Sequence, residues 1–426
     1  MNCKFYFLSL LLVLFSAQIS LANESAAVLA RKAVSEDPAE ATAAIEELRA
    51  LGPEGLEALM TQYAAHINTR VTGPRTGDTP EWLRIANALD LVGQQKNNFI
   101  SGLYWYTDLE EAKRAARESG KPILSLHLLG NLTDELSCAN SRFFRTVLYP
   151  NAQIRDVLRN RFVLHWKSVR PVPRITVDFG DGRKLERTVT GNSIHYILDS
   201  NGGLIEALPG LYGPAAFKRG LEGAETLLRS LAGKNDRERN FLLIKYYGER
   251  TSQIWREWQA DTKQFGDKIA QRLRVPPGQN TDAVSAASGA MTKMGIERPF
   301  VRSITSISDD GGITNEDAWR VIAFAHQADA TLDERSRSLM ERQNRSVPVD
   351  QLIRMIARFQ ESIALDTVRN EYLMHPRLYN LLTDESIRSD LEKFNDTVYM
   401  MLFRTPNSDR WLGLVSNDLY TAIEDK

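Results

Sequence analysis

The chain has 426 residues, of which 43% are hydrophobic and 25% are charged, and its formal net charge is −1 at pH 7. A chain of this length and apolar content can bury the cores of about two or three domains. The balanced charge argues against a general nucleic-acid binder, because phosphate contacts require concentrated Lys and Arg.

Residues 1–22 have the pattern of a secretory signal peptide. Lys4 gives a positive start, residues 5–15 are almost continuously apolar, and Ser20-Leu21-Ala22 supplies small residues before a cleavage site. We therefore expect a secreted or periplasmic protein after cleavage near Ala22. No later segment approaches the roughly 18 apolar residues of a membrane span, so we expect no transmembrane anchor.

The cysteine content limits the redox chemistry of the mature chain. Its two cysteines are Cys3 and Cys138, and Cys3 leaves with the predicted signal peptide. A single remaining cysteine cannot form an internal disulfide, so the stability of the protein must come from packing.

The segment 23–100 is predicted to be a helical region. Asp37-Pro38 and Thr79-Pro80 each place a capping side chain before a proline at the first helical position. A further helix is expected over Pro53–Ile67. The Gly, Pro and Thr residues of 72–78 indicate a loop.

The segment 101–234 alternates between predicted strands and helices. Short strands are expected at 103–106, 123–129 and 162–167, and helices at 107–119, 141–148 and 151–159. Gly180-Asp181-Gly182 and Ser200-Asn201-Gly202 are hairpin turns, joining strands at 175–179 and 184–189 and strands at 194–198 and 204–208. With a final helix over Pro214–Leu231, this order predicts an α/β domain with a mixed sheet and helices on both faces.

The segment 235–426 is predicted to be all-α. Phe241, Leu242, Ile244, Trp255 and Trp258 mark a long first helix, and further helices are expected at 315–328, 349–372 and 385–403. The prolines at 276 and 277 indicate a linker over 274–280. No catalytic constellation is evident in this region, and its aromatic and aliphatic stripes are typical of a core.

The middle region resembles secreted thioredoxin-like domains over residues 103–231. The resemblance rests on Trp105 and the Ala- and Glu-rich segment after it, on Gly120-Lys121-Pro122 before a strand, and on Leu198-Asp199 at a hairpin. In such domains a Cys-x-x-Cys motif follows the first central strand and begins the next helix. The matching residues here are Cys138-Ala139-Asn140-Ser141. The resemblance thus implies a thioredoxin-like central domain between two helical regions.

Two departures separate this chain from a dithiol oxidoreductase of that family. Ser141 replaces the second cysteine, which resolves mixed disulfides in the family. Ser193 stands where the family has a proline that faces the active cysteine. Both differences argue against a general dithiol oxidoreductase.

Cys138 remains the candidate catalytic residue. At a helix N-terminus the backbone N–H groups and the helix dipole favour the thiolate. Ser141 can donate a hydrogen bond to the sulfur, and Arg142 and Arg145 add positive potential on the same helical face. We expect a solvent-accessible nucleophile that exchanges with a protein disulfide or a small thiol and needs an external thiol for release. The alternative is a packed cysteine in a non-catalytic binding or scaffold protein.

Three histidines leave a second question open. His127, His165 and His195 lie on predicted strands of the same sheet. Together with Cys138 they could bind copper or zinc, and His195 could serve as a base for the thiol. We expect instead that each is a hydrogen-bonded core histidine, and we predict no metal and no cofactor.

Overall fold

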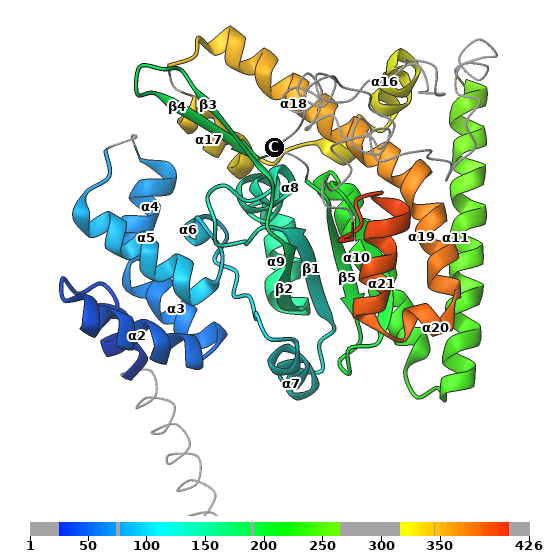
Figure 1. The fold of residues 1–426 in the computed structure, drawn as a ribbon, viewed down its shortest axis with the longest axis horizontal. Coiled ribbons are helices and arrows are strands. Elements are labelled where there is room, and N and C mark those ends of the chain that lie inside the picture. The colour runs from blue at the N-terminus through cyan, green and yellow to red at the C-terminus, as the bar shows by residue number, and fades with distance from the viewer. Residues whose placement is uncertain (1–24, 74–76, 189–190, 265–315, 345, 409–426) are drawn as a thin grey trace, which may run out of the picture. The chain divides into compact units, whose positions relative to one another are not determined.

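The computed structural model describes residues 25–73, 77–188, 191–264, 316–344 and 346–408 (Figure 1). The predicted signal peptide and the predicted linker at 274–280 lie outside these ranges. Within the described part of the chain, no helix has the length and apolarity needed to cross a membrane.

The chain divides into two compact units. Of the described residues, the first unit contains 25–105 together with 133–135. The second contains 106–132 and 136–408, and so includes both the predicted α/β region and the helices that follow it.

The first unit is helical, as predicted. A helix over residues 25–32 precedes α2 (Pro38–Ala50), α3 (Pro53–Gln62), α4 (Ala64–Thr72), α5 (Pro80–Gly93) and α6 (Asn98–Ser101). The two predicted caps are present: Asp37 accepts from the Ala39 N–H at 2.9 Å, and Thr79 accepts from the Trp82 N–H at 3.1 Å. Both caps satisfy N–H groups that a helix start leaves free.

The predicted helix over Pro53–Ile67 is wrong in one respect, because it is interrupted at Tyr63. The backbone of Tyr63 leaves the helical region, with φ −109° and ψ 22°, and separates α3 from α4. Leu59, Tyr63 and Ile67, spaced by four residues, all belong to the same apolar core, so the buried face continues across the interruption.

The second unit is built on a four-stranded mixed sheet in the order β2-β1-β5-β6 (Figure 1). The strands are β1 (Ile123–Leu129), β2 (Val163–Arg170), β5 (Ser193–Leu198) and β6 (Leu204–Pro209). β1 runs parallel to β2 and antiparallel to β5, and β5 forms the predicted hairpin with β6. β1, β5 and β6 are buried along their whole length, which explains their near-continuous apolar sequences.

The connecting helices follow the predicted order. They are α7 (Leu109–Ser119), α8 (Ala139–Phe143), the π-helical turn η1 (Phe144–Leu148), α9 (Ala152–Arg161) and α10 (Pro214–Leu231). The helix predicted over 141–148 thus changes to π-helical hydrogen bonding after its first turn.

Helices cover both faces of the sheet. On one face the ring of His195 packs against Phe144 of η1 and Phe217 of α10, with centroid distances of 4.7 and 4.9 Å. On the other face His127 and Tyr196 each lie 3.1 Å from the Asn395 side-chain oxygen of α21 (Leu391–Thr397). The predicted mixed sheet with helices on both faces is confirmed.

The strand predicted at 103–106 is wrong. Only Tyr106 makes a bridge to the sheet, with His165 of β2. Trp105 is fully buried in the first unit, where its backbone N–H donates to Gly93 and its indole donates to Gln95. Because these groups are already bonded there, the segment cannot continue as a strand.

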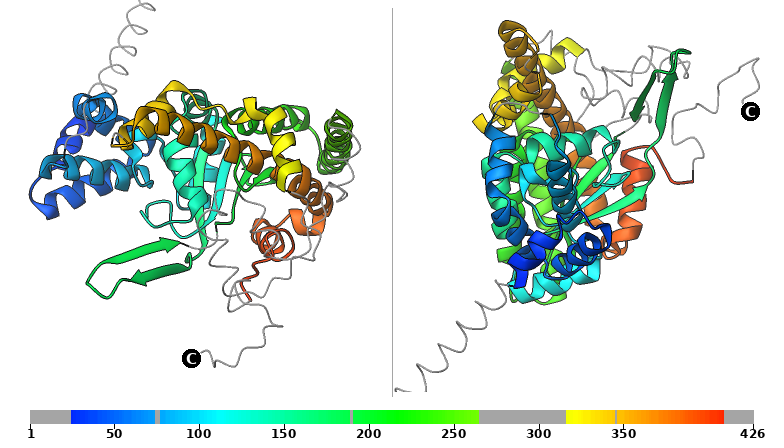
Figure 2. Two further views of the ribbon diagram at one scale, coloured as in Figure 1. Left: turned by 90° about the horizontal axis from the view of Figure 1, so that it is seen from above. Right: turned by 90° about the vertical axis from the view of Figure 1, so that its left-hand side faces the viewer.

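The inserted hairpin consists of β3 (Arg174–Asp178) and β4 (Lys184–Thr188), as predicted. These two strands form a sheet of their own among the described residues. Both views in Figure 2 show the hairpin standing away from the helices of the second unit.

The C-terminal part of the second unit is helical, as predicted, and packs on the sheet. Its elements are α11 (Asp236–Gln264), α16 (Glu316–Ala325), η2 (Gln327–Ala330), α17 (Glu334–Gln343), α18 (Val349–Arg369), η3 (Asn370–Met374), α19 (His375–Thr383), α20 (Glu385–Arg388), α21 and η4 (Val398–Leu402). The π-helical turn η3 precedes Pro376, which lacks the N–H that would continue an α-helix.

Candidate functional site

Cys138 lies where the sequence predicted, directly before a helix that follows β1. It is the N-cap of α8, and its sulfur accepts the Ser141 backbone N–H at 3.5 Å. The contact satisfies one of the free N–H groups of the first helical turn. Cys138 therefore has a structural role as a cap, whatever its chemistry.

The prediction that Cys138 is accessible to solvent is wrong. Its exposed fraction is 0%. Burial raises the pKa of the Tyr149 and Tyr399 phenols, and an electrostatic interaction with the nearby Cys138 adds to this effect. Tyr399 comes from the C-terminal η4 and donates to the Asn192 carbonyl at 3.1 Å. A residue more than two hundred positions away in the chain thus lies close to Cys138.

The polar residues around Cys138 bond mainly to one another. The hydroxyl of Ser141 lies 2.9 Å from that of Ser137, which also accepts from Arg145 at 3.4 Å. Arg142 reaches the Thr188 hydroxyl of β4 at 3.5 Å. The predicted stabilisers Ser141 and Arg142 are thus near Cys138 in the chain, but their side chains bond to Ser137 and to the inserted hairpin.

Ser193 does meet the cysteine-bearing helix. Its hydroxyl accepts from the Asn140 side chain at 2.9 Å. Asn140 belongs to the Cys138–Ser141 motif, so Ser193 lies against that motif. The contact ties the start of β5 to the start of α8.

The three histidines do not converge on a metal site. His127 and His165 share one face of the sheet, with ring centroids 6.4 Å apart, whereas His195 pairs with Leu126 and lies on the opposite face. Burial lowers the pKa of each of these histidines to about 3, so all three are neutral at physiological pH. Among the residues that the structure describes, no group of three His, Cys, Asp or Glu could hold a metal ion.

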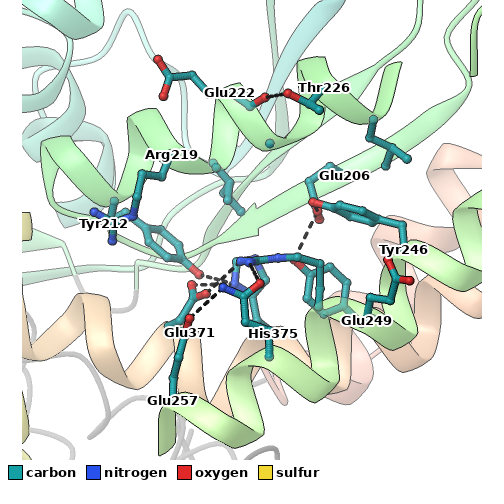
Figure 3. A pocket seen from close by; sticks show the side chains of 18 of the residues that line it. Glu206, Tyr212, Arg219, Glu222, Thr226, Tyr246, Glu249, Glu257, Glu371 and His375 are labelled. Carbon is teal, nitrogen blue, oxygen red and sulfur yellow. Dashed lines mark hydrogen bonds and ion pairs between the residues drawn. The ribbon is translucent and has the colours of Figure 1, made fainter. Parts of the chain in front are cut away.

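A second site, which the sequence analysis did not single out, is a pocket of about 690 Å³ in the second unit, lined by apolar, charged and tyrosine side chains (Figure 3). Its walls come from α10 and α11, and its floor from β6 and the segment from α18 to α19. This volume falls within the range that binds small molecules in other proteins. We call it the β6 pocket.

The floor of the β6 pocket carries a buried carboxyl group, Glu206 of β6, with an exposed fraction of 2%. Glu206 accepts from the Tyr246 and Tyr379 hydroxyls at 3.0 and 3.2 Å and from the Ala207 N–H at 2.8 Å. Burial raises the pKa of this carboxyl, since desolvation disfavours its charge. Figure 3 shows the side chains of Glu206 and Tyr246 side by side.

Next to Glu206 lies an ion cluster formed by His375, Glu371 and Arg250. His375 Nδ1 lies 2.9 Å from Glu371, and Nε2 lies 3.0 Å from the Ala207 carbonyl oxygen. Arg250 of α11 approaches the same glutamate at 3.4 Å. Burial alone would lower the pKa of His375, but the neighbouring Glu371 and Glu206 raise it above its usual value.

The outer part of the pocket is also internally paired. Arg219 of α10 forms a two-point contact with Asp329, at 2.5 and 2.7 Å. Lys245 lies 3.8 Å from Glu249 on the exposed surface of α11. Arg219 and Lys245 thus already have acidic partners within the wall, so neither cation requires an anionic ligand.

Glycines on α10 keep the space between the helices open. Gly220 and Gly223 both line the pocket, and a Cβ atom at Gly223 would lie 3.6 Å from the Tyr246 hydroxyl. One signal in the sequence could have indicated this site: Glu206 interrupts an otherwise apolar strand, and a buried carboxylate needs compensating partners. Those partners come from distant helices, so the sequence alone did not identify them.

Comparison with known proteins does not assign this chain to a family. No protein-family model, no curated protein and no solved structure matches this chain.

Proposed function

We propose that this protein is a secreted or periplasmic, non-catalytic binding protein with a thioredoxin-like core. The core assignment is supported by the strand order β2-β1-β5-β6, by the position of Cys138 after β1 and by the closing β5–β6 hairpin and α10. The contact between Asn140 and Ser193 supports the same assignment.

One contrast carries the proposal: the thiol is sealed, while the β6 pocket is accessible. Cys138 has no exposed surface, whereas the pocket rim includes side chains such as Arg219 and Lys245, which are 61% and 57% exposed. A binding pocket with a preformed polar floor fixes the orientation of a ligand without reorganising.

The chemistry of the β6 pocket favours a small polar ligand without net charge, such as a polyol or a zwitterion. Its ion pairs are internally balanced, so a net charge on the ligand would leave an uncompensated group in the pocket. The carboxylate and hydroxyl oxygens of the pocket can each accept a further hydrogen bond beyond those already made, and tyrosine rings offer flat apolar surfaces.

A monothiol function remains a second candidate because of one observation. Cys138 caps α8 and its sulfur accepts an N–H, the arrangement that stabilises thiolates in other proteins. In this reading Ser141 and Arg142 assist the thiol, and a protein disulfide or a small thiol is the partner. It requires that the residues covering Cys138 move away to admit that partner, because the sulfur has no exposed surface.

Ligand-induced thermal stabilisation separates the two readings. We expect at least one compound in a panel of neutral polyols and amino acids to raise the melting temperature of the protein. The Tyr246→Phe variant, which loses a hydroxyl at the pocket floor, should lose that stabilisation. The matched variant Tyr399→Phe, which loses a hydroxyl bonded near the thiol, should retain it.

The proposal fails if no compound in the panel stabilises the protein. It also fails if Tyr399→Phe abolishes the effect and Tyr246→Phe does not.

A further inference from the structure

The inserted hairpin exposes apolar side chains to solvent. Val177, Phe179 and Leu185 have exposed fractions of 44%, 54% and 37%. Val177 lies opposite Leu185 across the two strands, so both project from the same face. A two-stranded hairpin is only marginally stable alone in water. Such a hairpin gains stability when another strand or surface covers it.

The outer edge of β3 offers free backbone hydrogen-bonding groups. The Phe179 N–H donates to the Arg183 carbonyl at 3.1 Å, in the register of the hairpin. In an antiparallel pair, bonded and non-bonded residue pairs alternate. Counting back from this bond, the N–H and C=O groups of Arg174, Thr176 and Asp178 point away from β4. This edge can accept a further strand.

The side chains of β3 are complementary to a second copy of the same strand. β3 has the sequence Arg174-Ile175-Thr176-Val177-Asp178. If two copies pair antiparallel about Thr176, each Arg174 faces an Asp178, each Ile175 faces a Val177, and the threonines face each other. Opposite charges and β-branched pairs at directly facing positions stabilise antiparallel sheets.

We propose that two copies of this protein associate through the β3 edges of their hairpins, forming a four-stranded sheet in the order β4-β3-β3-β4. Such an interface is self-complementary under a two-fold axis, the usual symmetry of homodimers. It also joins the apolar faces of the hairpins, with Val177 of each copy beside Ile175 of the other and Leu185 next to Val177 within its own hairpin.

The charges of the two hairpins extend the same pattern. Within one copy Lys184 lies 3.5 Å from Asp178. In the dimer each Asp178 then lies between Lys184 of its own hairpin and Arg174 of the second copy. The outer edge of β4 lacks this property, because antiparallel pairing about its central residue brings two copies of Glu186 together. The choice of edge is therefore specific.

Charge reversal tests the proposal by sedimentation velocity over a wide range of protein concentration. The wild-type chain should show a monomer–dimer equilibrium of moderate affinity, as expected for a small interface. Arg174→Asp and Asp178→Arg should each weaken dimerisation roughly ten- to hundredfold, because each places like charges opposite one another twice. The control Glu186→Lys reverses a charge on β4 and should dimerise like the wild type.

Mixing the two single variants provides the decisive test of the dimer interface. One variant presents two carboxylates on β3 and the other presents two guanidinium groups, so each restores the pairs that the other has lost. The equimolar mixture should form heterodimers, and the double variant Arg174→Asp/Asp178→Arg should form homodimers. A wild type that stays monomeric, single variants that dimerise as it does, or a mixture that stays monomeric would each overturn the proposal.

Discussion

Glu371 favours the doubly protonated form of His375. The Nε2 atom of His375 lies 3.0 Å from a backbone carbonyl oxygen, which can only accept, so this nitrogen carries a proton. The Nδ1 atom lies 2.9 Å from a carboxylate oxygen. Arg250 and the imidazole lower the pKa of Glu371, although burial alone would raise it. The floor of the β6 pocket therefore contains a histidinium–carboxylate pair.

The His375–Glu371 pair should contribute to the unfolding free energy with a bell-shaped dependence on pH. The raised pKa of His375 means that its stabilisation is complete below about pH 6.5 and is lost as pH rises through the folded value. The lowered pKa of Glu371 means that its stabilisation is present above about pH 4.5 and is lost as pH falls through the folded value. The pair therefore contributes most between these limits.

Replacing Glu371 with glutamine should reveal this window. Glu371 is 26% exposed, so we expect a loss of about 2 kcal/mol of unfolding free energy, below the value for fully buried pairs. Urea unfolding at a series of pH values should show the largest difference from wild type inside the window. Glu249→Gln, on the exposed rim, is the control. A deficit that is the same at every pH would contradict the assignment.

Because the buried histidines of the sheet are neutral, the folded protein should lose stability as the pH falls. The pKa of His195 is lowered to about 3, whereas an unfolded chain protonates histidine near pH 6.5. Between these values the unfolded state binds the extra proton, so stability falls as pH falls, by about 1.4 kcal/mol per pH unit for each such histidine. His195→Gln should remove that part of the slope between about pH 4 and pH 6.

Wild type, measured in parallel over the same pH range, is the reference for the histidine experiment. An unchanged slope in His195→Gln would show that His195 already accepts a proton in the folded protein.

Cys138 is predicted to act as a helix cap. Serine is a preferred N-cap residue, so Cys138→Ser should retain the bond to the Ser141 N–H and stay within about 1 kcal/mol of wild type. Cys138→Ala should cost about 1–2 kcal/mol more than the serine variant, since the N–H loses its acceptor inside the protein. Chemical denaturation measures both. Equal stabilities of the two variants would argue against the capping role.

Two glycines of α10 should respond differently to alanine. At Gly223 the nearest atom to an added Cβ is the Tyr246 hydroxyl at 3.6 Å, an ordinary contact. Gly223→Ala should stabilise the protein by about 0.5–1 kcal/mol, because alanine favours the helix interior. At Gly220 the added Cβ would lie 2.7 Å from the buried Leu208 side chain. Gly220→Ala should therefore stabilise the protein less than Gly223→Ala does, or destabilise it. Thermal unfolding of both variants tests the difference.

The sequence predicted local features well where local chemistry determines them. Pro214 at a helix start and the glycine turns at 180–182 and 202 specify α10 and both hairpins without help from the rest of the chain. The prediction of a strand at 103–106 was wrong because Trp105 packs into the first unit and not against the sheet of the second. Such competition between tertiary contacts is not visible in a short window of sequence.

The candidate site was harder to predict for the same reason. The position of Cys138 at a helix start follows from local pattern, but its burial depends on Tyr149 and on Tyr399, which lies far along the chain. The β6 pocket likewise joins Glu206, Arg250 and His375 from three distant segments. Their pairing arises only when α11 and α19 pack against the sheet.

The reactivity of Cys138 distinguishes a binding protein from a thiol enzyme most directly. The measurement is the rate of iodoacetamide labelling of Cys138 in the native protein at neutral pH, compared with the rate in urea. Because the sulfur is fully buried, we predict negligible native labelling and a rate that rises only as the protein unfolds. Prompt labelling of the fully folded protein would contradict this account and favour the monothiol function.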